Sequence, residues 1–542
     1  MFIPALLSLA AATQQPAVAT RLEVRPEGAF WVSTTDASHA AGSAGPAAPQ
    51  TTARWEDNHS GLAWIGAHVA VGDNGAAIVA GKELNNEAAS FYAAGSATEL
   101  FGASLVGAER VRVAISARSP LAATLVHTSI GGGSYQAVLT AYDTSGAGAA
   151  LWSYTFPAGG NVIAGEVLIS ADGRRVVAVA GSASLVQNMI RVFDANGALL
   201  NGFDVAAPAN LRQARASDDC GRLYLALYNG LAEIWDTATG ANLMSYPIGS
   251  TFDAHALSGD GMSFAYGNFG GLYVRRETSP GVWNQVAFMP VSAGGQYLGF
   301  VDLDADGSHA AWQQQRYSPA YDHVEVGLFD VAANAVVWSD SHDAPGTSMQ
   351  LVNTGVQISA DGTQVVGCTW GDSLNATPEV FGYDAAGAMS MSLDTPGSVY
   401  EIDLDADGDV VAVGTKAVHA NTSGNGGSIF CIEPYEPTLR LLGQPRLGGP
   451  VTLTTPGGAT AARFAFCRQL GSSGTPFGTM EVNLGTLMHS AGPVPVPPGG
   501  LSLILNLPPN PALAALAVHV QGARFAPGNN TLTNKVSIRL LP

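Results

Sequence analysis

Residues 167–179 read Val-Leu-Ile-Ser-Ala-Asp-Gly-Arg-Arg-Val-Val-Ala-Val, and residues 356–367 read Val-Gln-Ile-Ser-Ala-Asp-Gly-Thr-Gln-Val-Val-Gly. Each stretch places an Asp-Gly turn between two runs that are rich in β-branched residues. Glycine provides the positive φ that a tight turn between two strands requires. The two stretches therefore predict β-hairpins, and their similarity indicates an internal repeat.

Six further copies of this motif occur, at residues 69–75, 111–118, 216–221, 256–261, 301–307 and 402–408. The copy at 111–118 has lost its glycine. The units recur about every 40 to 50 residues, which is typical of folds in which each repeat buries its faces only against its neighbours. We therefore expect the eight units to close into a ring.

A second element recurs further along most units, a strand that ends in an aromatic residue followed by aspartate. It occurs at Tyr142-Asp143, Phe193-Asp194, Trp235-Asp236, Phe329-Asp330 and Tyr383-Asp384. We interpret it as a third strand, with residues 151–156 and 336–338 as examples of a fourth. Four short strands per unit is the composition of a β-propeller blade. The aromatic-Asp pair resembles the Trp-Asp signature of WD40 repeats, and residues 55–436 resemble WD40-like and quinoprotein-like propellers.

The repeat stops after Pro434 and Pro437, and six or seven alternating strands separated by Pro and Gly turns follow. This size and pattern predict a small β-sandwich. Residues 442–450 and 532–536 resemble a module at the C-termini of exported planctomycete-type proteins. The predicted fold class is therefore all-β: a seven- or eight-bladed β-propeller, residues 55–436, followed by a β-sandwich, residues 438–542.

Residues 1–19 are predicted to be a signal peptide, because an apolar run precedes the A-x-A pattern Ala17-Val18-Ala19. The alternative is a buried first strand. Residues 20–54 combine two short strands, 22–25 and 29–32, with a linker rich in Ala, Gly and Pro. These strands could pair as a hairpin or supply the outer strand of the last blade. We expect a bacterial protein that is secreted or associated with the cell envelope.

Composition excludes several classes of partner. Acidic residues outnumber basic ones 43 to 24, and the resulting net charge of -19 repels phosphate backbones, so we expect no nucleic acid partner. No stretch beyond the leader is apolar over about 18 residues, which predicts no membrane span. The four cysteines contain no C-x-x-C pair. Cys431 and Cys467 could form a disulfide, or all four cysteines could be buried thiols.

Two of the turns carry extra carboxylates. Their acidic residues are Asp302, Asp304 and Asp306 before Gly307, and Asp403, Asp405 and Asp407 before Gly408. This alternation is that of the first half of an EF-hand calcium loop. The acid that would complete such a loop is replaced by Gln313 or Gly414. We therefore interpret both segments as solvated hairpin turns, with weak calcium binding as the alternative.

Two other sets of residues suggest chemistry more weakly. Gly371-Asp-Ser-Leu374 spells the nucleophile block of a lipase and esterase family, but it lies within a repeat, so we interpret it as a polar loop. The histidines show no metal-binding spacing, although a ring could bring distant ones together at its channel. They include His68, His127, His255, His309, His323, His342 and His419.

These observations favour a non-catalytic, secreted or envelope-associated scaffold, a monomer without a cofactor, that binds a protein, peptide or glycan on a propeller face. The alternative is an exported hydrolase or dehydrogenase whose site is assembled at the central funnel. Acidic and histidine side chains within hydrogen-bonding reach in the funnel would favour the enzyme. An apolar funnel, or one with scattered polar groups, would favour the scaffold.

Overall fold

The computed structural model describes residues 19–25, 28–34 and 51–539, the last range without residues 60–64, 73–74, 76, 84–86, 105–107, 145–147, 158–160, 183–186, 207–210, 250–252, 293, 345–350, 373–374, 420–425, 434–438, 443–448, 456, 476–477, 508, 510–516 and 527–528. Residues 1–48 and 49–542 are separate units. In the first, β1 (Ala19–Arg25) and β2 (Gly28–Thr34) pair as a hairpin, so these strands do not close a blade. The predicted signal peptide, apart from its last residue, lies outside the described residues.

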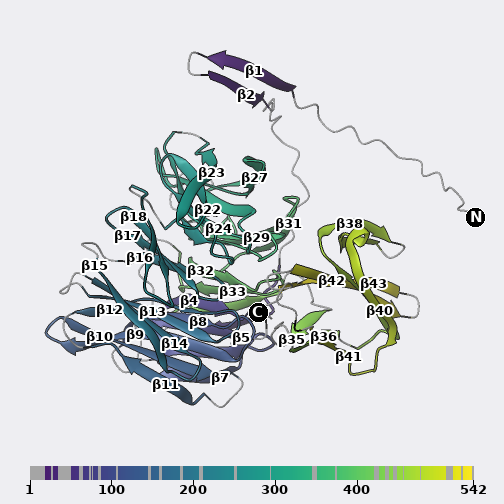
Figure 1. The fold of residues 1–542 in the computed structure, drawn as a ribbon, viewed down its shortest axis with the longest axis horizontal. Coiled ribbons are helices and arrows are strands. Elements are labelled where there is room, and N and C mark those ends of the chain that lie inside the picture. The colour runs from purple at the N-terminus through teal and green to yellow at the C-terminus, as the bar shows by residue number, and fades with distance from the viewer. Residues whose placement is uncertain are drawn as a thin grey trace, which may run out of the picture. The chain divides into compact units, whose positions relative to one another are not determined.

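The described part of residues 55–432 forms eight four-stranded antiparallel sheets, the blades of a β-propeller (Figure 1). From blade 1 to blade 8, the inner strands are β4 (Ile65–Val71), β8 (Ala108–Ile115), β12 (Val162–Ile169), β16 (Leu211–Ala216), β20 (His255–Leu257), β24 (Gln296–Leu303), β28 (Asn353–Ile358) and β32 (Val399–Leu404). The second strands are β5 (Ala77–Glu83), β9 (Leu121–Gly131), β13 (Arg175–Ser182), β17 (Arg222–Leu227), β21 (Ser263–Gly267), β25 (His309–Arg316), β29 (Gln364–Thr369) and β33 (Val411–Thr415).

The third strands, in the same order, are β6 (Glu87–Ala93), β10 (Ser134–Asp143), β14 (Gln187–Asp194), β18 (Leu231–Asp236), β22 (Gly271–Ser279), β26 (His323–Asp330), β30 (Val380–Asp384) and β34 (Ser428–Ile432). The outer strands are β7 (Glu99–Ser104), β11 (Ala150–Thr155), β15 (Leu199–Ala206), β19 (Asn242–Pro247), β23 (Val282–Pro290), β27 (Ala335–Asp343), β31 (Met389–Leu393) and β3 (Trp55–Asn58). The predicted propeller is confirmed, and of the two predicted blade numbers the structure has eight.

The ring is closed at blade 8 by a strand from the other end of the propeller sequence. Each inner strand contacts the inner strand of the next blade, and β32 contacts β4. The outer strand of blade 8 is β3, which pairs with β34 so that Trp55 lies opposite Cys431. This pairing removes an open sheet edge and joins the first and last parts of the propeller sequence.

The aromatic residues of the recurring aromatic-Asp pairs pack neighbouring blades against each other. The aromatic ring at the end of a third strand packs against an aromatic ring on the outer strand of the preceding blade. These pairs are Phe101–Tyr142, Trp152–Phe193, Phe203–Trp235 and Trp338–Tyr383, with ring centroids 4.9–6.1 Å apart. Such contacts add to the burial of apolar area between the blades. The aspartate that follows the ring accepts backbone N–H groups of the next turn, as Asp194 does from Asn196 and Ala198.

The C-terminal residues form two antiparallel sheets with one shared hydrophobic core. One sheet has the order β35 (Arg440–Leu442), β36 (Pro450–Thr455), β41 (Leu501–Asn506), and the other has the order β40 (Leu487–Pro495), β37 (Ala461–Cys467), β42 (Ala517–Ala526), β43 (Asn529–Arg539). A hairpin, β38 (Leu470–Thr475) and β39 (Gly478–Val482), and a 3-10 turn, Leu484–Thr486, complete it. Leu453, Phe464 and Val520 share the core, as expected for a β-sandwich. The predicted junction at Pro434 and Pro437 lies outside the described residues.

All four cysteines are buried thiols, and none takes part in a disulfide. Cys431 Sγ donates a hydrogen bond to Ala94 O at 3.4 Å, which links blade 8 to blade 1. The disulfide considered between Cys431 and Cys467 is therefore absent from this structure. In the part of the chain that the structure describes, no helix is long and apolar enough to cross a membrane.

Candidate functional site: the central channel

The inner strands of all eight blades line a central channel. A cavity of about 810 Å³ lies at the end where the Asp-Gly turns are found, which we call the turn end. A second cavity, of about 560 Å³, lies toward the opposite end. The two cavities share Arg215, Asp302, Gln357 and Glu401, so they are parts of one channel. A channel of this kind can present groups from every blade to one ligand.

Backbone hydrogen bonds connect the turns at this end of the channel. Ala305 N donates to Ala360 O at 3.0 Å, and Ala360 N donates to Ala406 O at 2.8 Å, so the bonds run from one blade to the next. The turn glycine also packs against the preceding blade. Gly362 has a φ of +74°, and a Cβ there would lie 3.0 Å from Asp304 Oδ2. Glycine is needed there for both its conformation and its small size.

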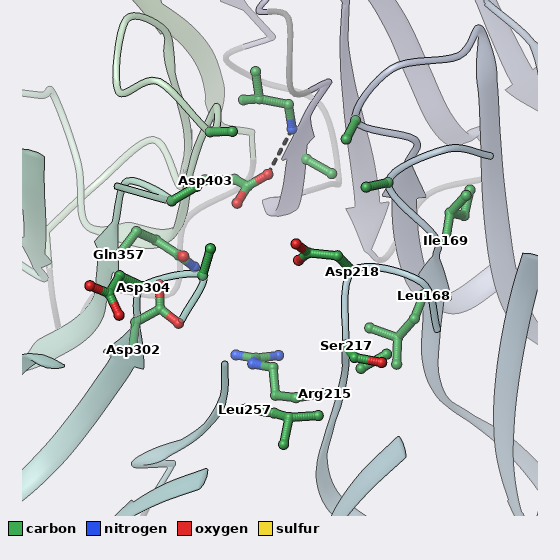
Figure 2. Close-up of a pocket in the computed structure, with 18 of the residues that line it drawn as sticks. Leu168, Ile169, Arg215, Ser217, Asp218, Leu257, Asp302, Asp304, Gln357 and Asp403 are labelled. Atoms are coloured by element: carbon green, nitrogen blue, oxygen red, sulfur yellow. Dashed lines mark hydrogen bonds between the residues drawn. The ribbon is translucent and has the colours of Figure 1, made fainter. Parts of the chain in front are cut away.

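The first aspartate of each Asp-rich turn connects two blades. Asp302 Oδ2 accepts a hydrogen bond from Ile358 N of blade 7 at 3.1 Å. Asp403 Oδ2 accepts one from Val71 N of blade 1 at 2.7 Å, shown as a dashed line in Figure 2. Each carboxylate therefore fixes the end of the next inner strand and at the same time faces the cavity.

The second aspartate lies inside its own turn, where most other blades have serine. In blade 7, Ser359 Oγ accepts from Gln364 N at 2.9 Å. In blade 8, Asp405 Oδ1 accepts from Val410 N at 2.9 Å and from Asp409 N at 2.7 Å. The bond to the residue five positions later is the same in both turns. Asp405 therefore replaces serine in a shared hydrogen-bond pattern.

The second aspartate of blade 6 also holds a histidine. Asp304 Oδ2 accepts from His309 N at 3.1 Å, from His309 Nδ1 at 2.9 Å and from Ser308 Oγ at 2.7 Å. The hydrogen bond to Asp304 raises the pKa of His309 above its usual value. The third aspartate, Asp306, accepts from Ser308 N at 2.9 Å, and its counterpart Asp407 lies in the cavity wall.

The three carboxylates of each Asp-rich turn thus have different surroundings: the next blade, the interior of the turn and the channel entrance. Among the described residues, no group of three or more His, Cys, Asp or Glu side chains lies where it could hold a metal ion. The hydrogen bonds account for the positions of these aspartates. Weak calcium binding by these turns stays a prediction.

Two carboxyls of the channel wall have raised pKa values. Burial raises the pKa of Asp302 to about 6, although the backbone N–H of Ile358 and the charge of Arg215 act in the opposite direction. Burial raises the pKa of Asp403 to about 7, and the charge of Glu401 adds to this effect. Both carboxyls therefore change protonation close to neutral pH.

At the opposite end, a histidine, a carboxylate and an arginine from three blades meet. His68 Nδ1 lies 2.6 Å from Glu401 Oε2, and Arg112 Nη1 lies 3.1 Å from His68 Nδ1. Burial by itself would raise the pKa of Glu401. His68, Arg112 and Arg215 outweigh that effect and lower it below its usual value. Glu401 is therefore ionised at neutral pH and holds the imidazole in place.

Sequence reasoning had not singled out most of these channel residues. Arg215, Asp302, Gln357 and Asp403 each stand two positions before the Ser or Asp whose side chain accepts inside the turn, while Glu401 stands four positions before that residue. Alternate residues of a strand share one face. Polar residues at these two positions of an inner strand were the signal that could have identified the channel wall.

The remaining predicted site residues lie away from this wall. Asp372, in the Gly371–Leu374 block, is buried, and its Oδ2 accepts from Ala376 N and Thr377 N at 2.9 and 2.8 Å. Residues 373–374 lie outside the described residues. His255 lies 3.1 Å from Tyr224 Oη in the core.

The other histidines have separate surroundings. His127 lines the second cavity and lies 3.1 Å from Ala164 N. His323 is bound to Asp343 at 2.8 Å, and His342 to Tyr383 Oη at 2.8 Å. The ring therefore brings only some of the predicted histidines to the channel.

The chain was compared with protein families, curated proteins and solved structures. No family model matches it, and no curated protein matches it. Among solved structures it is similar to one titled "Structure of Dos1 propeller", with a TM-score of 0.48 and 10% sequence identity. That match covers 70% of this chain and 94% of the other.

Proposed function

We propose that this protein is a non-catalytic binding scaffold, secreted or associated with a bacterial cell envelope, whose ligand occupies the turn end of the central channel. The observation that carries the proposal is the 810 Å³ cavity, which residues from all eight inner strands line. Its volume lies in the range of small-molecule sites, about 300–1,000 Å³. Inter-blade hydrogen bonds, such as that from Val71 N to Asp403, fix its wall before a ligand arrives.

The proposal is tested by blocking the channel. Gln357 faces both cavities, so Gln357→Trp would fill the space that a ligand needs. The matched control is Leu199→Trp, on an outer strand where the leucine is 53% exposed. Peptide and glycan arrays probed with the native protein and both variants should give ligands that Gln357→Trp loses and Leu199→Trp keeps. Equal binding by all three proteins, or no binding to either array, would contradict the proposal.

The proposed location rests on the sequence of the first 19 residues. N-terminal sequencing of the mature protein should begin near Thr20. A protein that keeps Met1 and is recovered from the cell interior would refute export.

A second candidate is an exported hydrolase or dehydrogenase with its site in the same channel. Two contacts in the channel favour it, His68 with Glu401 at 2.6 Å and His309 with Asp304 at 2.9 Å, because histidines within hydrogen-bonding reach of carboxylates are the feature expected of an enzyme at the funnel. The His309–Asp304 pair is arranged differently from the His68–Glu401 pair. His309 directs the same nitrogen, Nδ1, toward both Asp304 and Ser308, so no serine-histidine-carboxylate relay forms there. Mass spectrometry of a ligand recovered from the channel distinguishes the candidates, since only an enzyme would return it altered.

A further inference from the structure

Arg215 places a positive charge in the channel wall. Its hydrogen bonds to described residues go to Ala214 O, at 3.3 Å, and to the side-chain oxygen of Gln213, so none goes to a carboxylate. Figure 2 shows its guanidinium directed into the cavity from the wall that also carries Asp218. A guanidinium offers several donors in a planar fork that suits a carboxylate.

The opposite wall carries negative charge. Asp302 and Asp403 lie there (Figure 2), and each uses one oxygen for a backbone N–H of the next blade. Neither carboxylate forms an ion pair within the described part of the chain, because both accept only from main-chain donors. Charges in a partly buried channel are costly unless they are paired.

The charges are also ordered along the channel. Of the charged residues that line only the cavity at the turn end, most are acidic, Asp218 and Asp403 among them, although Arg118 and Arg468 also line it. Those that line only the cavity toward the opposite end are Arg110, Arg112 and Asp253. Arg215 lines both cavities and lies between these groups. A molecule with charges of both signs would therefore have one preferred direction in the channel.

We propose that the channel binds an amino carboxylate, an amino acid or a short peptide, with its carboxylate on Arg215 and its ammonium group between Asp302 and Asp403. This inference rests on the proposed function, because it assigns a ligand class to the same cavity. The three residues come from blades 4, 6 and 8, so the two charges of the ligand have to be separated across the channel. Such a ligand would form direct ion pairs with Arg215, Asp302 and Asp403, which these three side chains do not form with other described residues.

The test uses ω-amino acids from 3-aminopropanoate to 8-aminooctanoate, measured by isothermal titration calorimetry at pH 7.5, where both end groups are ionised. The series varies the distance between the charges. Hexanoate and hexylamine are the single-charge controls. At least one amino acid should bind tenfold or more tightly than either control. Failure of every length to bind better than the controls would overturn the inference.

Two variants test where the carboxylate and the ammonium group of the ligand bind, and a third variant is their control. Arg215→Gln should reduce the affinity for the best amino acid about tenfold and leave hexylamine binding unchanged. Asp403→Asn should weaken the binding of both. Arg174→Gln is the matched control, since this arginine is 65% exposed and lies outside the channel. Unchanged affinity in Arg215→Gln would refute the assignment of the carboxylate.

The two proposals can fail separately. If Gln357→Trp abolishes the binding of an array ligand but no ω-amino acid competes with that ligand, the channel is the binding site and the amino carboxylate class is wrong. If an ω-amino acid binds equally well to Gln357→Trp, the site lies elsewhere and the proposed function itself is wrong.

Discussion

The turns of blades 7 and 8 are neighbours in the ring, yet one reads Gln-Ile-Ser-Ala-Asp-Gly at 357–362 and the other Asp-Leu-Asp-Ala-Asp-Gly at 403–408. In both, a side chain at the third position accepts a backbone N–H five residues later. In both, the glycine packs against the preceding turn. An Asp-rich motif can therefore arise from a hydrogen-bond pattern that serine turns also satisfy.

Removal of the acceptor in the Asp-rich turn should have the largest effect. Asp405→Ala leaves the backbone N–H groups of Asp409 and Val410 without their acceptor in a buried turn. We expect the free energy of unfolding to fall by about 2–4 kcal/mol, measured by urea denaturation. Asp343→Ala is the control, because that side chain is 68% exposed. Equal stability of the two variants would show that the bonds to Asp405 are unimportant.

Replacing the aspartate of the blade 8 turn by the serine of the blade 7 turn should lower the free energy of unfolding less than Asp405→Ala does. In blade 7, Ser359 Oγ accepts from both Thr363 N and Gln364 N, at 3.1 and 2.9 Å. Asp405→Ser should therefore keep both bonds with a neutral acceptor and recover at least half of the loss seen in Asp405→Ala. We expect a decrease of about 1–1.5 kcal/mol. The reciprocal change, Ser359→Asp, should also fold. A serine variant as unstable as the alanine variant would mean that the two turns are not equivalent.

The first position of the two turns predicts a difference in pH dependence. Burial raises the pKa of Asp403 to about 7, from about 4 in an unfolded chain, whereas Gln357 does not titrate. Because the folded state holds this proton more tightly than the unfolded state, the contribution of Asp403 to the free energy of unfolding is full below pH 4 and is lost as the pH rises through 7. As the pH rises from 5 to 8, the free energy of unfolding should therefore fall less in Asp403→Asn than in the native protein. We expect the two decreases to differ by about 1 kcal/mol, a small value because the Asp403 side chain is partly exposed.

The readout for this prediction is the difference in thermal stability between the two proteins across that pH range. Asp204→Asn serves as the control, because it changes an exposed carboxylate whose partner, Arg191, keeps its charge across this range. If the difference between the two proteins does not change with pH, Asp403 is ionised in the folded protein throughout the range.

Removal of calcium should have the smallest effect. The Asp-rich turns lack the acid that completes a calcium loop, so any affinity should be weak, with a Kd of about 10⁻⁴ to 10⁻³ M. A ligand near its Kd adds only about 0.4 kcal/mol, so chelator should change the Tm by less than about 2 °C. A fall of about 10 °C that calcium reverses would make these turns metal sites, different in kind from the serine turns.

Much of the fold could be predicted because it is encoded locally. The Asp-Gly turns and the third strands ending at residues such as Asp194 and Asp236 depend on neighbours in the sequence. The closing strand could not be predicted, since β3 (Trp55–Asn58) pairs with β34 at the far end of the propeller. The strands at 22–25 and 29–32 were considered for that role and instead pair with each other. Partners so distant in sequence leave no local pattern.

The ring of repeated four-stranded units can be recognised from the amino-acid sequence alone, because turn chemistry and alternation of apolar residues act over a few residues. That there are eight blades, and that β3 closes the ring, follows only from the folded chain, because both depend on pairing between distant segments. The same is true of the side chains that meet in the channel. His68, Arg215 and Glu401 are far apart in the sequence, and only closure of the ring directs them toward one cavity.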